Sequence, residues 1–285
     1  MEFKSQIIIN GATFNWVKTQ RDGLTAIYTD NSTFLRIGSP EKIKKDLSVH
    51  KKLEEYNFPV AKLLDEGQIG EMSYFTETSL GSEHFGTLFK EEFNEHGQIT
   101  DETFNKFLVV CGKFVDSQLK TATTQKDWDG FRTAIHLDLI CAELPEYKEK
   151  ILNAYKIVEK RLSVLPFVIT HGDFTPFNIL PEGIIDTENV FSGPAGYDIG
   201  GILAIPNWFP DSTEYELHQV YKLTPEQKQK FLEMVDSIYV NNSLPKISDF
   251  LEEFNFTRGM WFAARMSRFP KLQEFRYALL KSLVS

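Results

Sequence analysis

Residues 167–188 constrain the fold of this chain more than any other segment, because they set polar groups between short apolar strands. The run reads Phe-Val-Ile-Thr-His-Gly, continues Asp-Phe-Thr-Pro-Phe-Asn-Ile-Leu, and is followed after two residues by Gly-Ile-Ile-Asp-Thr-Glu. This pattern predicts an apolar strand, a polar turn, and a return to apolar strand. Three oxygen-bearing side chains stand at the predicted strand ends: Asp173, Asn178 and Asp186.

These three side chains are of the kinds that phosphoryl transfer requires. One carboxylate must orient the attacking hydroxyl and accept its proton, and oxygen ligands must hold Mg²⁺ against the phosphates of the donor. Asp173 suits the first role, while Asn178 and Asp186 suit the second. The spacing H-G-D-x-x-x-x-N matches the kinase catalytic-loop pattern H-R-D-x-x-x-x-N in its His, Asp and Asn. Asp173 alone would more often be a turn residue than a catalyst, so the assignment depends on the whole string.

The motifs in this region resemble those of the aminoglycoside phosphotransferase and choline kinase superfamily. H-G-D-x-x-x-x-N, I-D-x-E and G-P-x-x-Y-D occur in the family's order and separation within residues 171–198. The resemblance implies a bilobal, protein-kinase-like fold and a kinase that moves the terminal phosphoryl group of ATP or GTP to a hydroxyl of a small molecule. It also implies Mg²⁺ as a cofactor.

The resemblance carries roles onto individual residues. Asp173 would be the catalytic base, and Asn178 and Asp186 would bind Mg²⁺. Many members carry a basic residue and a glycine where this chain has Thr175 and Phe177, and we expect Phe177 to pack under the loop. The structural residues near the site would be His171, Glu188 and Asp198, with His171 and Asp198 bracing the loop.

The order of expected elements predicts an α+β fold of two lobes, residues 1–78 and 79–285. The first lobe is expected to be a small antiparallel sheet with one helix that begins at Pro40, where a proline suits the first turn. Its expected strands are Thr13–Lys18, Leu24–Thr29, Thr33–Ile37, Val60–Leu64 and Met72–Thr76. The second lobe is expected to be helical, with helices capped at Thr100 and Thr224 and a last helix that runs from Ser248 toward Phe269.

The nucleotide is expected to bind in the first lobe, where the match to the family is weaker. The turn Lys18–Thr25 would cover the phosphates, with donors around Gly23 and Thr25. Arg36 stands where the family has a phosphate-binding Lys, and Asp46 stands where the family has a Glu, so we expect these two to pair. The hinge, Met72–Leu80, would bind the purine edge through backbone groups at Glu77 and Thr78.

The overall charge limits the partners that this chain is expected to have. The formal net charge is −9, which argues against a duplex nucleic-acid partner because such proteins usually present a basic face. No apolar run is long enough to suggest a membrane span, and no signal-peptide core is evident, so we expect a cytoplasmic protein. The acceptor is expected to be a small hydroxylated molecule, and aromatic and acidic residues in 128–131 and 208–214 make a cationic one a candidate.

Two other functions stay open at this point. A non-catalytic nucleotide-binding protein of the pseudokinase type is favoured by Arg36 and by the glycine-poor turn before Thr25, and opposed by the complete Asp173, Asn178 and Asp186 set. A regulatory kinase acting on protein side chains is disfavoured because no clear activation segment separates Asp186 from Gly193-Pro194.

Overall fold

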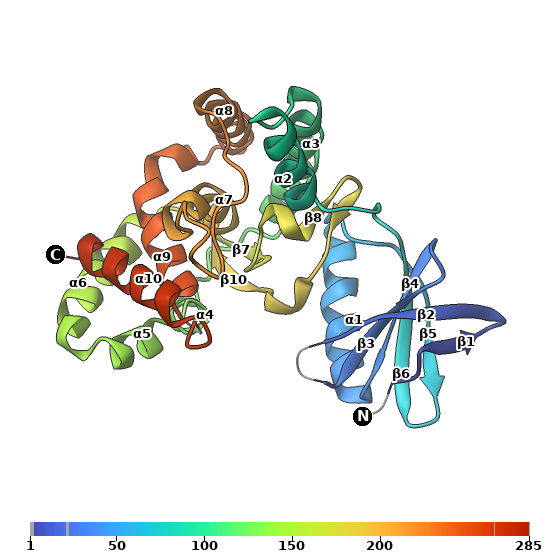
Figure 1. Ribbon diagram of the computed structural model, residues 1–285. Coiled ribbons are helices and arrows are strands. Elements are labelled where there is room, and N and C mark those ends of the chain that lie inside the picture. The colour runs from blue at the N-terminus through green and yellow to red at the C-terminus, as the bar shows by residue number, and fades with distance from the viewer. Residues whose placement is uncertain (1–2, 21–22, 265, 285) are drawn as a thin grey trace.

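The computed structural model describes residues 3–20, 23–264 and 266–284. The chain forms two lobes, a sheet flanked by one helix and a larger helical lobe, and residues 79–84 lead from one to the other (Figure 1). The predicted α+β architecture, with a small antiparallel-sheet lobe followed by a helical lobe, is confirmed.

The small lobe is a six-stranded antiparallel sheet with one long helix against it (Figure 1). Its strand order is β1-β2-β3-β4-β6-β5. The predicted meander is present, but β1 adds a strand to it that was not predicted, and β5 begins at Leu63, later than expected. Buried Tyr28, Leu35 and Ile37 form part of the lobe's core. The elements are β1 (Gln6–Ile9), β2 (Ala12–Thr19), β3 (Thr25–Thr29), β4 (Thr33–Gly38), α1 (Pro40–Glu55), β5 (Leu63–Ile69) and β6 (Met72–Thr78).

The large lobe contains α2 to α10, and two of its helices begin at the predicted caps. The Thr100 hydroxyl accepts from the amide of Thr103, and Thr224 forms a capping box with Gln227. None of the helices in the described part of the chain is long and apolar enough to cross a membrane. The helices are α2 (Phe85–His96), α3 (Asp101–Lys120), α4 (Trp128–Ala134), α5 (Leu137–Glu143), α6 (Lys148–Leu162), α7 (Tyr197–Trp208), α8 (Pro225–Asn241), α9 (Leu251–Ala263) and α10 (Pro270–Leu283).

The C-terminal region differs from the prediction of one long last helix from Ser248. A short 3₁₀ turn, Ile247–Phe250, precedes α9, which ends at Ala263, and α10 then follows as a separate helix. The α9 backbone is extended at Ala264, with ψ at 153°, which ends the helix before the predicted Phe269.

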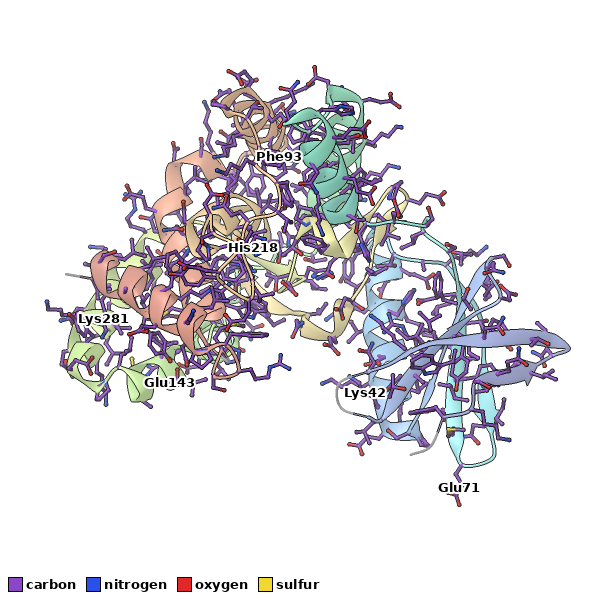
Figure 2. All side chains as sticks on the ribbon, in the orientation of Figure 1. Lys42, Glu71, Phe93, Glu143, His218 and Lys281 are labelled. Atoms are coloured by element: carbon purple, nitrogen blue, oxygen red, sulfur yellow. The ribbon has the colours of Figure 1, made fainter. Side chains whose placement is uncertain are left out.

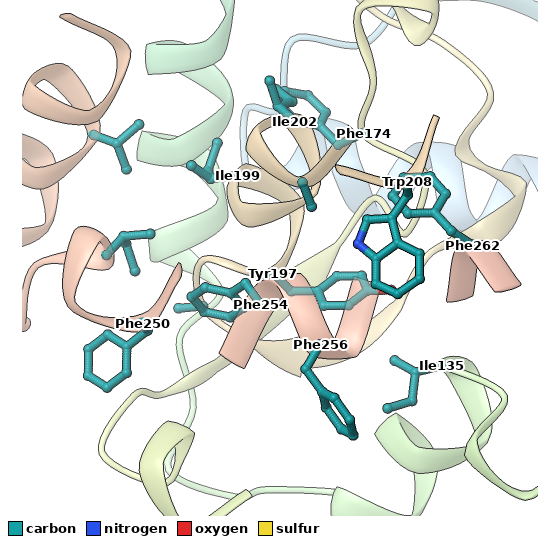
Figure 3. Close-up of a cluster of buried hydrophobic side chains, with 14 of the residues drawn as sticks. Ile135, Phe174, Tyr197, Ile199, Ile202, Trp208, Phe250, Phe254, Phe256 and Phe262 are labelled. Carbon is teal, nitrogen blue, oxygen red and sulfur yellow. The ribbon is translucent and has the colours of Figure 1, made fainter. Parts of the chain in front are cut away.

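The core of the large lobe is built where α7 crosses α9, and Figure 3 shows its aromatic and aliphatic side chains gathered there. The two helices approach closely because α7 carries glycine at the crossing: a Cβ on Gly200 would stand 2.3 Å from the Cβ of Phe254. Trp208 and Phe131, which were candidates for binding an acceptor, are buried in this core instead. Most aromatic side chains of the large lobe thus serve to pack its core.

Two short sheets belong to the large lobe. The strand β7 (Phe167–Thr170) pairs with β10 (Phe191–Pro194), and β8 (Ile179–Leu180) pairs with β9 (Gly183–Ile184). The polar turn predicted after residue 170 connects β7 to β8, and the acid predicted at a strand end follows β9.

Candidate active site

The turn that follows β7 needs a glycine at its second residue. Gly172 has φ of +82°, and a Cβ there would lie 2.3 Å from the carbonyl oxygen of Asn189. Both the left-handed backbone and the close approach exclude a side chain at this position. Glycine is therefore required on steric grounds in the His-Gly-Asp sequence, and the turn that it allows presents Asp173.

Asp198, near the start of α7, holds this turn from behind. Its carboxylate is fully buried and accepts hydrogen bonds from the amides of His171 (2.9 Å) and Gly172 (3.0 Å). The side-chain amide of Gln118 also donates to it, at 2.7 Å. Burial raises the pKa of the Asp198 carboxyl, and the neighbouring His171 opposes that rise. The carboxylate anchors the loop backbone and stands behind the turn that presents Asp173.

His171 bridges the turn to the strand that precedes Asp186. Its Nε2 lies 2.8 Å from the carbonyl oxygen of Ile185, which can only accept, so Nε2 carries the proton. Its Nδ1 then accepts from the amide of Asp173, at 3.3 Å. Both ring nitrogens are thus engaged within the loop, which fits a positioning role.

Asp173 is the carboxylate of this turn, and 28% of its side chain is exposed. The side-chain amide of Asn178 donates to the backbone carbonyl of Asp173 at 2.8 Å and to its Oδ2 at 3.3 Å. These two bonds fix the orientation of the carboxylate and use both donors of Asn178. The Oδ1 atom of Asn178 is the one that can still act as a metal ligand.

A buried arginine behind Asp173 was not predicted. Arg258, in α9, is fully buried, and its Nη2 lies 4.0 Å from Oδ1 of Asp173. Its Nη1 donates to the carbonyl of Gly172 at 2.5 Å and to the hydroxyl of Tyr197 at 3.2 Å. The signal in the sequence was a single cation within Phe-Thr-Arg-Gly-Met-Trp-Phe, a helical stretch with no other charge. Such a cation must find partners inside the fold.

Asn178 and Asp186 are brought together by the β8–β9 hairpin. Ile179 pairs with Ile184, and the amide of Ile185 donates to the carbonyl of Asn178 at 3.0 Å, so the residue after Ile185 lies beside Asn178. Both side chains line the same cleft. Asp186 itself has φ of +64°, an uncommon conformation that aspartate tolerates better than most residues.

The hairpin is bonded to the small lobe as well as to the catalytic loop. The amide of Ile184 donates to the carbonyl of Pro59 at 2.7 Å, and the amide of Glu182 donates to the carbonyl of Leu80 at 3.2 Å. Glu188, just beyond the hairpin, lies 3.9 Å from the ammonium group of Lys42 in α1. Figure 2 shows Lys42 on the side of α1 that faces the large lobe.

The donor set at the hairpin fits Mg²⁺ bound together with phosphates. The described residues contain no cluster of three or more His, Cys, Asp or Glu side chains that could hold a metal alone. Mg²⁺ characteristically takes one or two carboxylates and completes its shell with water and substrate phosphates. One carboxylate from Asp186 and one amide oxygen from Asn178 match that requirement.

The cleft between the lobes has a volume of about 500 Å³ and is lined from both sides. Of the predicted nucleotide-binding residues, Arg36, Glu77 and Thr78 line it, together with Asn178 and Asp186. Among the described residues, those lining the cleft do not include Gly23, Thr25 or Asp46. The turn before Gly23 contains Arg21 and Asp22, which lie outside the described residues, and the Thr25 hydroxyl is buried against its own sheet.

The ion pair predicted between Arg36 and Asp46 is replaced by two others. The Nε of Arg36 lies 3.3 Å from Oε1 of Glu77, and the ammonium group of Lys42 lies 3.3 Å from Asp46. Lys42 is one helical turn before Asp46, so it reaches that acid within α1. Burial would lower the pKa of the Arg36 guanidinium, but Glu77, Asp46 and Asp186 together raise it. Asp46 therefore contributes charge at longer range without pairing.

One backbone donor of the predicted hinge is already paired. The amide of Thr78 donates to the carbonyl of Lys62 at 3.0 Å, and its hydroxyl accepts from the amide of Lys62, so this amide is paired within the sheet and does not face a purine. The side chain of Glu77 lines the cleft, and its Oε2 lies 3.5 Å from Nδ1 of His50. Sequence reasoning missed His50, which lies beside Glu77 because α1 packs against β6.

A second cavity, of about 260 Å³, lies on the other side of the catalytic loop. Asp173, Thr175 and Phe177 line it on the side of the loop, and the rest of its wall comes from α7, residues 209–223, α9, Met266 and Arg276. Phe177 lines both cavities and is 43% exposed. It stands between the two cavities with its ring against Gly86 of α2, and does not pack under the loop as predicted.

Most of the predicted acceptor residues lie away from this second cavity. Trp128 packs edge-on against Phe131 and Phe167, and Asp211 pairs with Lys222 at the surface. Of the two predicted clusters, only Phe209 lines the cavity as far as the chain is described. Figure 2 shows His218, another of its lining residues, in the middle of the large lobe.

Comparisons with known proteins agree on one family. The model of the phosphotransferase enzyme family matches residues 10–231, whereas a comparison with curated proteins finds no match. Three solved structures share the fold at low identity. An aminoglycoside phosphotransferase in ternary complex with AMP-PNP and hygromycin B is 12% identical, with 95% of this chain and 92% of that chain covered and a TM-score of 0.58.

The other two structures are of an ethanolamine kinase and of a protein of the choline/ethanolamine kinase family. The ethanolamine kinase of Plasmodium vivax is 12% identical, with 95% and 81% of the two chains covered and a TM-score of 0.55. A choline/ethanolamine kinase family protein from Mesorhizobium loti is 13% identical, with 95% and 87% covered and a TM-score of 0.53. At these identities the likeness establishes the bilobal, kinase-like fold.

Proposed function

The chain belongs to the phosphotransferase enzyme family, and on that premise we propose that it transfers the terminal phosphoryl group of ATP or GTP to a hydroxyl group of a small molecule. The family membership confirms the resemblance predicted from the motifs. One observation carries the proposal furthest. Asp173 borders the second cavity, while Asn178, bonded to it, lines the cleft beside Asp186.

Asp173 would act as the base toward an acceptor in the second cavity. Its carboxylate is partly exposed and lines the second cavity, while Asn178, to which Asp173 is bonded, lines the cleft. An acceptor hydroxyl in the cavity could therefore meet a phosphoryl group from the cleft. Asn178 orients the carboxylate, and Arg258 supplies positive charge 4.0 Å from it. Positioning and electrostatics of this kind supply most of the catalysis in phosphoryl transfer.

The cleft would hold the donor nucleotide with Mg²⁺. When bound, the metal would neutralise charge on the phosphates, and Asn178 and Asp186 would be its protein ligands. Arg36 would add a cation beside the phosphates, oriented by Glu77. The aminoglycoside phosphotransferase of the same fold is in complex with AMP-PNP, which supports a nucleotide as the donor.

A non-catalytic nucleotide-binding protein is the second candidate. The observation that favours it is the ion pairing of Arg36, which joins it to a strand residue, Glu77, and not to the acid of α1. In that case the cleft would bind nucleotide, but the terminal phosphoryl group of ATP would not be transferred to an acceptor.

Transfer of label from γ-labelled ATP and GTP to a panel of small alcohols, peptides and amino-sugars, with Mg²⁺, tests the proposal. We expect transfer to at least one alcohol and none to peptides. Asp173→Asn should lower kcat by about 10² to 10⁴, the usual cost of a lost general base, with little change in nucleotide affinity. Transfer at the wild-type rate in this variant would remove Asp173 from the role. Nucleotide binding with no transfer to any acceptor would favour the non-catalytic alternative.

A further inference from the structure

The second cavity has an apolar wall. Ile202 and Ile205 of α7, Leu217 and Val220 of the 209–223 segment, and Trp261 of α9 all line it. Burial of apolar surface is the main source of affinity that such a wall can offer a ligand. A molecule that fills this cavity must therefore present an apolar body.

Arg276 of α10 contributes a buried cation to this wall. It is 1% exposed, its Nε donates to the carbonyl of Trp208 at 2.9 Å, and its Nη1 donates to the carbonyl of Phe262 at 2.5 Å. Its Nη2 is buried and has no hydrogen-bond partner among the described residues. The guanidinium is thus fixed by two carbonyls and keeps one nitrogen unused.

The partners of Arg276 do not neutralise it. Trp208 ends α7 and Phe262 is in the last turn of α9, so their carbonyls belong to the negative ends of two helix dipoles. Within the described part of the chain, no carboxylate lies within ion-pair distance of Arg276. Burial lowers the pKa of its guanidinium to about 10, which leaves it charged at neutral pH. A buried cation without a counter-charge is costly.

The cavity also offers few acidic groups to a ligand. Asp173 is the single carboxylate among the described residues that line it, and the proposed reaction needs that carboxylate for the acceptor hydroxyl. A second buried cation, Arg258, stands behind the same wall with its guanidinium carbon 4.5 Å from the ring of Trp261. An acceptor with several ammonium groups would find two arginines and no spare acid.

We infer that the acceptor is a hydroxylated molecule with an apolar body and an anionic oxygen group such as a carboxylate, and that Arg276 is the residue that selects the anionic group. This inference rests on the proposed function because it treats the bound molecule as the acceptor. The binding of that molecule can nevertheless be measured without turnover. Arginine donors to a carboxylate form charge-assisted hydrogen bonds, which are stronger than neutral ones.

Binding of three matched alcohols to nucleotide-free protein tests the inference. The probes are 4-(hydroxymethyl)benzoate, 4-methylbenzyl alcohol and 4-(aminomethyl)benzyl alcohol, which share a ring and a hydroxyl and carry negative, neutral and positive charge. Calorimetry, or the fluorescence of Trp261 in the wall, reports binding. We expect the anionic alcohol to bind at least about tenfold more tightly than the cationic one, the size of a charge-assisted hydrogen bond. Arg276→Met should abolish that preference.

Leu217 offers a second test if Arg276→Met fails to fold. Leu217 lines the cavity and is 38% exposed, so a polar side chain there should be tolerated. Leu217→Asp should weaken the anionic alcohol several-fold relative to Leu217→Asn, which has the same shape without the charge. The neutral alcohol should bind both variants alike.

Three results overturn the inference: a cationic alcohol that binds as tightly as the anionic one, an anion preference that survives both Arg276→Met and Leu217→Asp, or no binding of the anionic alcohol at millimolar concentration. Label transfer from ATP separates this failure from failure of the proposed function. Transfer to cationic alcohols alone would contradict the inference and support the proposed kinase activity. Tight binding of the anionic alcohol with no transfer to any alcohol would support an anion site at Arg276 and contradict the proposed kinase activity.

Discussion

Arg36 and Glu77 form the ion pair that sets the charge at the base of the cleft, so their coupling can be measured. Arg36→Met should raise the Kd for nucleotide because a cation beside the phosphates is lost, and Glu77→Gln should do so less, through a misplaced Arg36. In the double-mutant cycle, residues in contact should show a coupling of about 0.5 to 3 kcal/mol. Calorimetric titration of the four proteins with ATP gives that coupling.

The matched control is a second cycle with Asp46→Asn in place of Glu77→Gln. Asp46 pairs with Lys42 and influences Arg36 from further away, so its coupling to Arg36 should be smaller. A larger coupling for Asp46 than for Glu77 would show that the pair first predicted from the sequence forms in solution.

Gly172 is a second single position with a sharp expectation. Alanine there would carry a left-handed backbone, which costs about 1 to 2 kcal/mol, and would also meet the carbonyl of Asn189. Gly97, after α2, has φ of +72° and open space around its Cα, so Gly97→Ala carries only the backbone cost. Urea unfolding should show Gly172→Ala to be less stable than Gly97→Ala by about a further 1 to 3 kcal/mol, the usual cost of overpacking. Equal losses would mean that the loop moves aside freely.

At the level of elements, the β8–β9 hairpin unites the two proposed metal ligands, and their substitutions should differ. Asp186→Asn removes the charge toward the metal, so it should abolish the dependence of nucleotide affinity on Mg²⁺. Asn178→Ala removes one neutral ligand and should weaken affinity less. It also frees the Asp173 carboxylate, whose Oδ2 it binds at 3.3 Å, so turnover should fall further than affinity. Titrations with and without Mg²⁺ measure the first effect, and a metal-independent affinity in the wild type would contradict the site.

Features with local causes were predictable from the sequence, and those with distant causes were not. The caps at Thr100 and Thr224 depend on residues three positions away, and the catalytic string lies within one stretch of chain. The partner of Arg36 is set by the register of β4 against β6, which brings residues 41 positions apart together. Arg276 gains its two carbonyls from the ends of α7 and α9, and no periodicity in the sequence specifies that meeting. The strand β1 was missed because its four residues show no clear alternation.

At the level of the whole molecule, a ligand that touches both lobes should stabilise the entire chain. Mg²⁺ and nucleotide at one hundred times the Kd should add about 2.7 kcal/mol to the free energy of unfolding, which corresponds to a rise of several degrees in Tm for a chain of this size. Thermal unfolding followed by circular dichroism measures the shift. Asp186→Asn should show a smaller shift at the same concentrations, and an equal shift in both proteins would place the nucleotide elsewhere.

The two attachments of the β8–β9 hairpin have a consequence for timing. Its backbone is bonded to Pro59 and Leu80 on the small-lobe side, whereas the turn that carries Asp173 is bonded to Asp198 and Arg258 deep in the large lobe. A rocking motion of one lobe over the other would therefore pull on this hairpin from both sides. Because Asn178, at the start of the hairpin, is also bonded to Asp173, the proposed metal ligands and the proposed base would shift at the same time. One short piece of backbone, joined to both lobes, thus makes the alignment of these groups depend on how the lobes sit, without any separate lid.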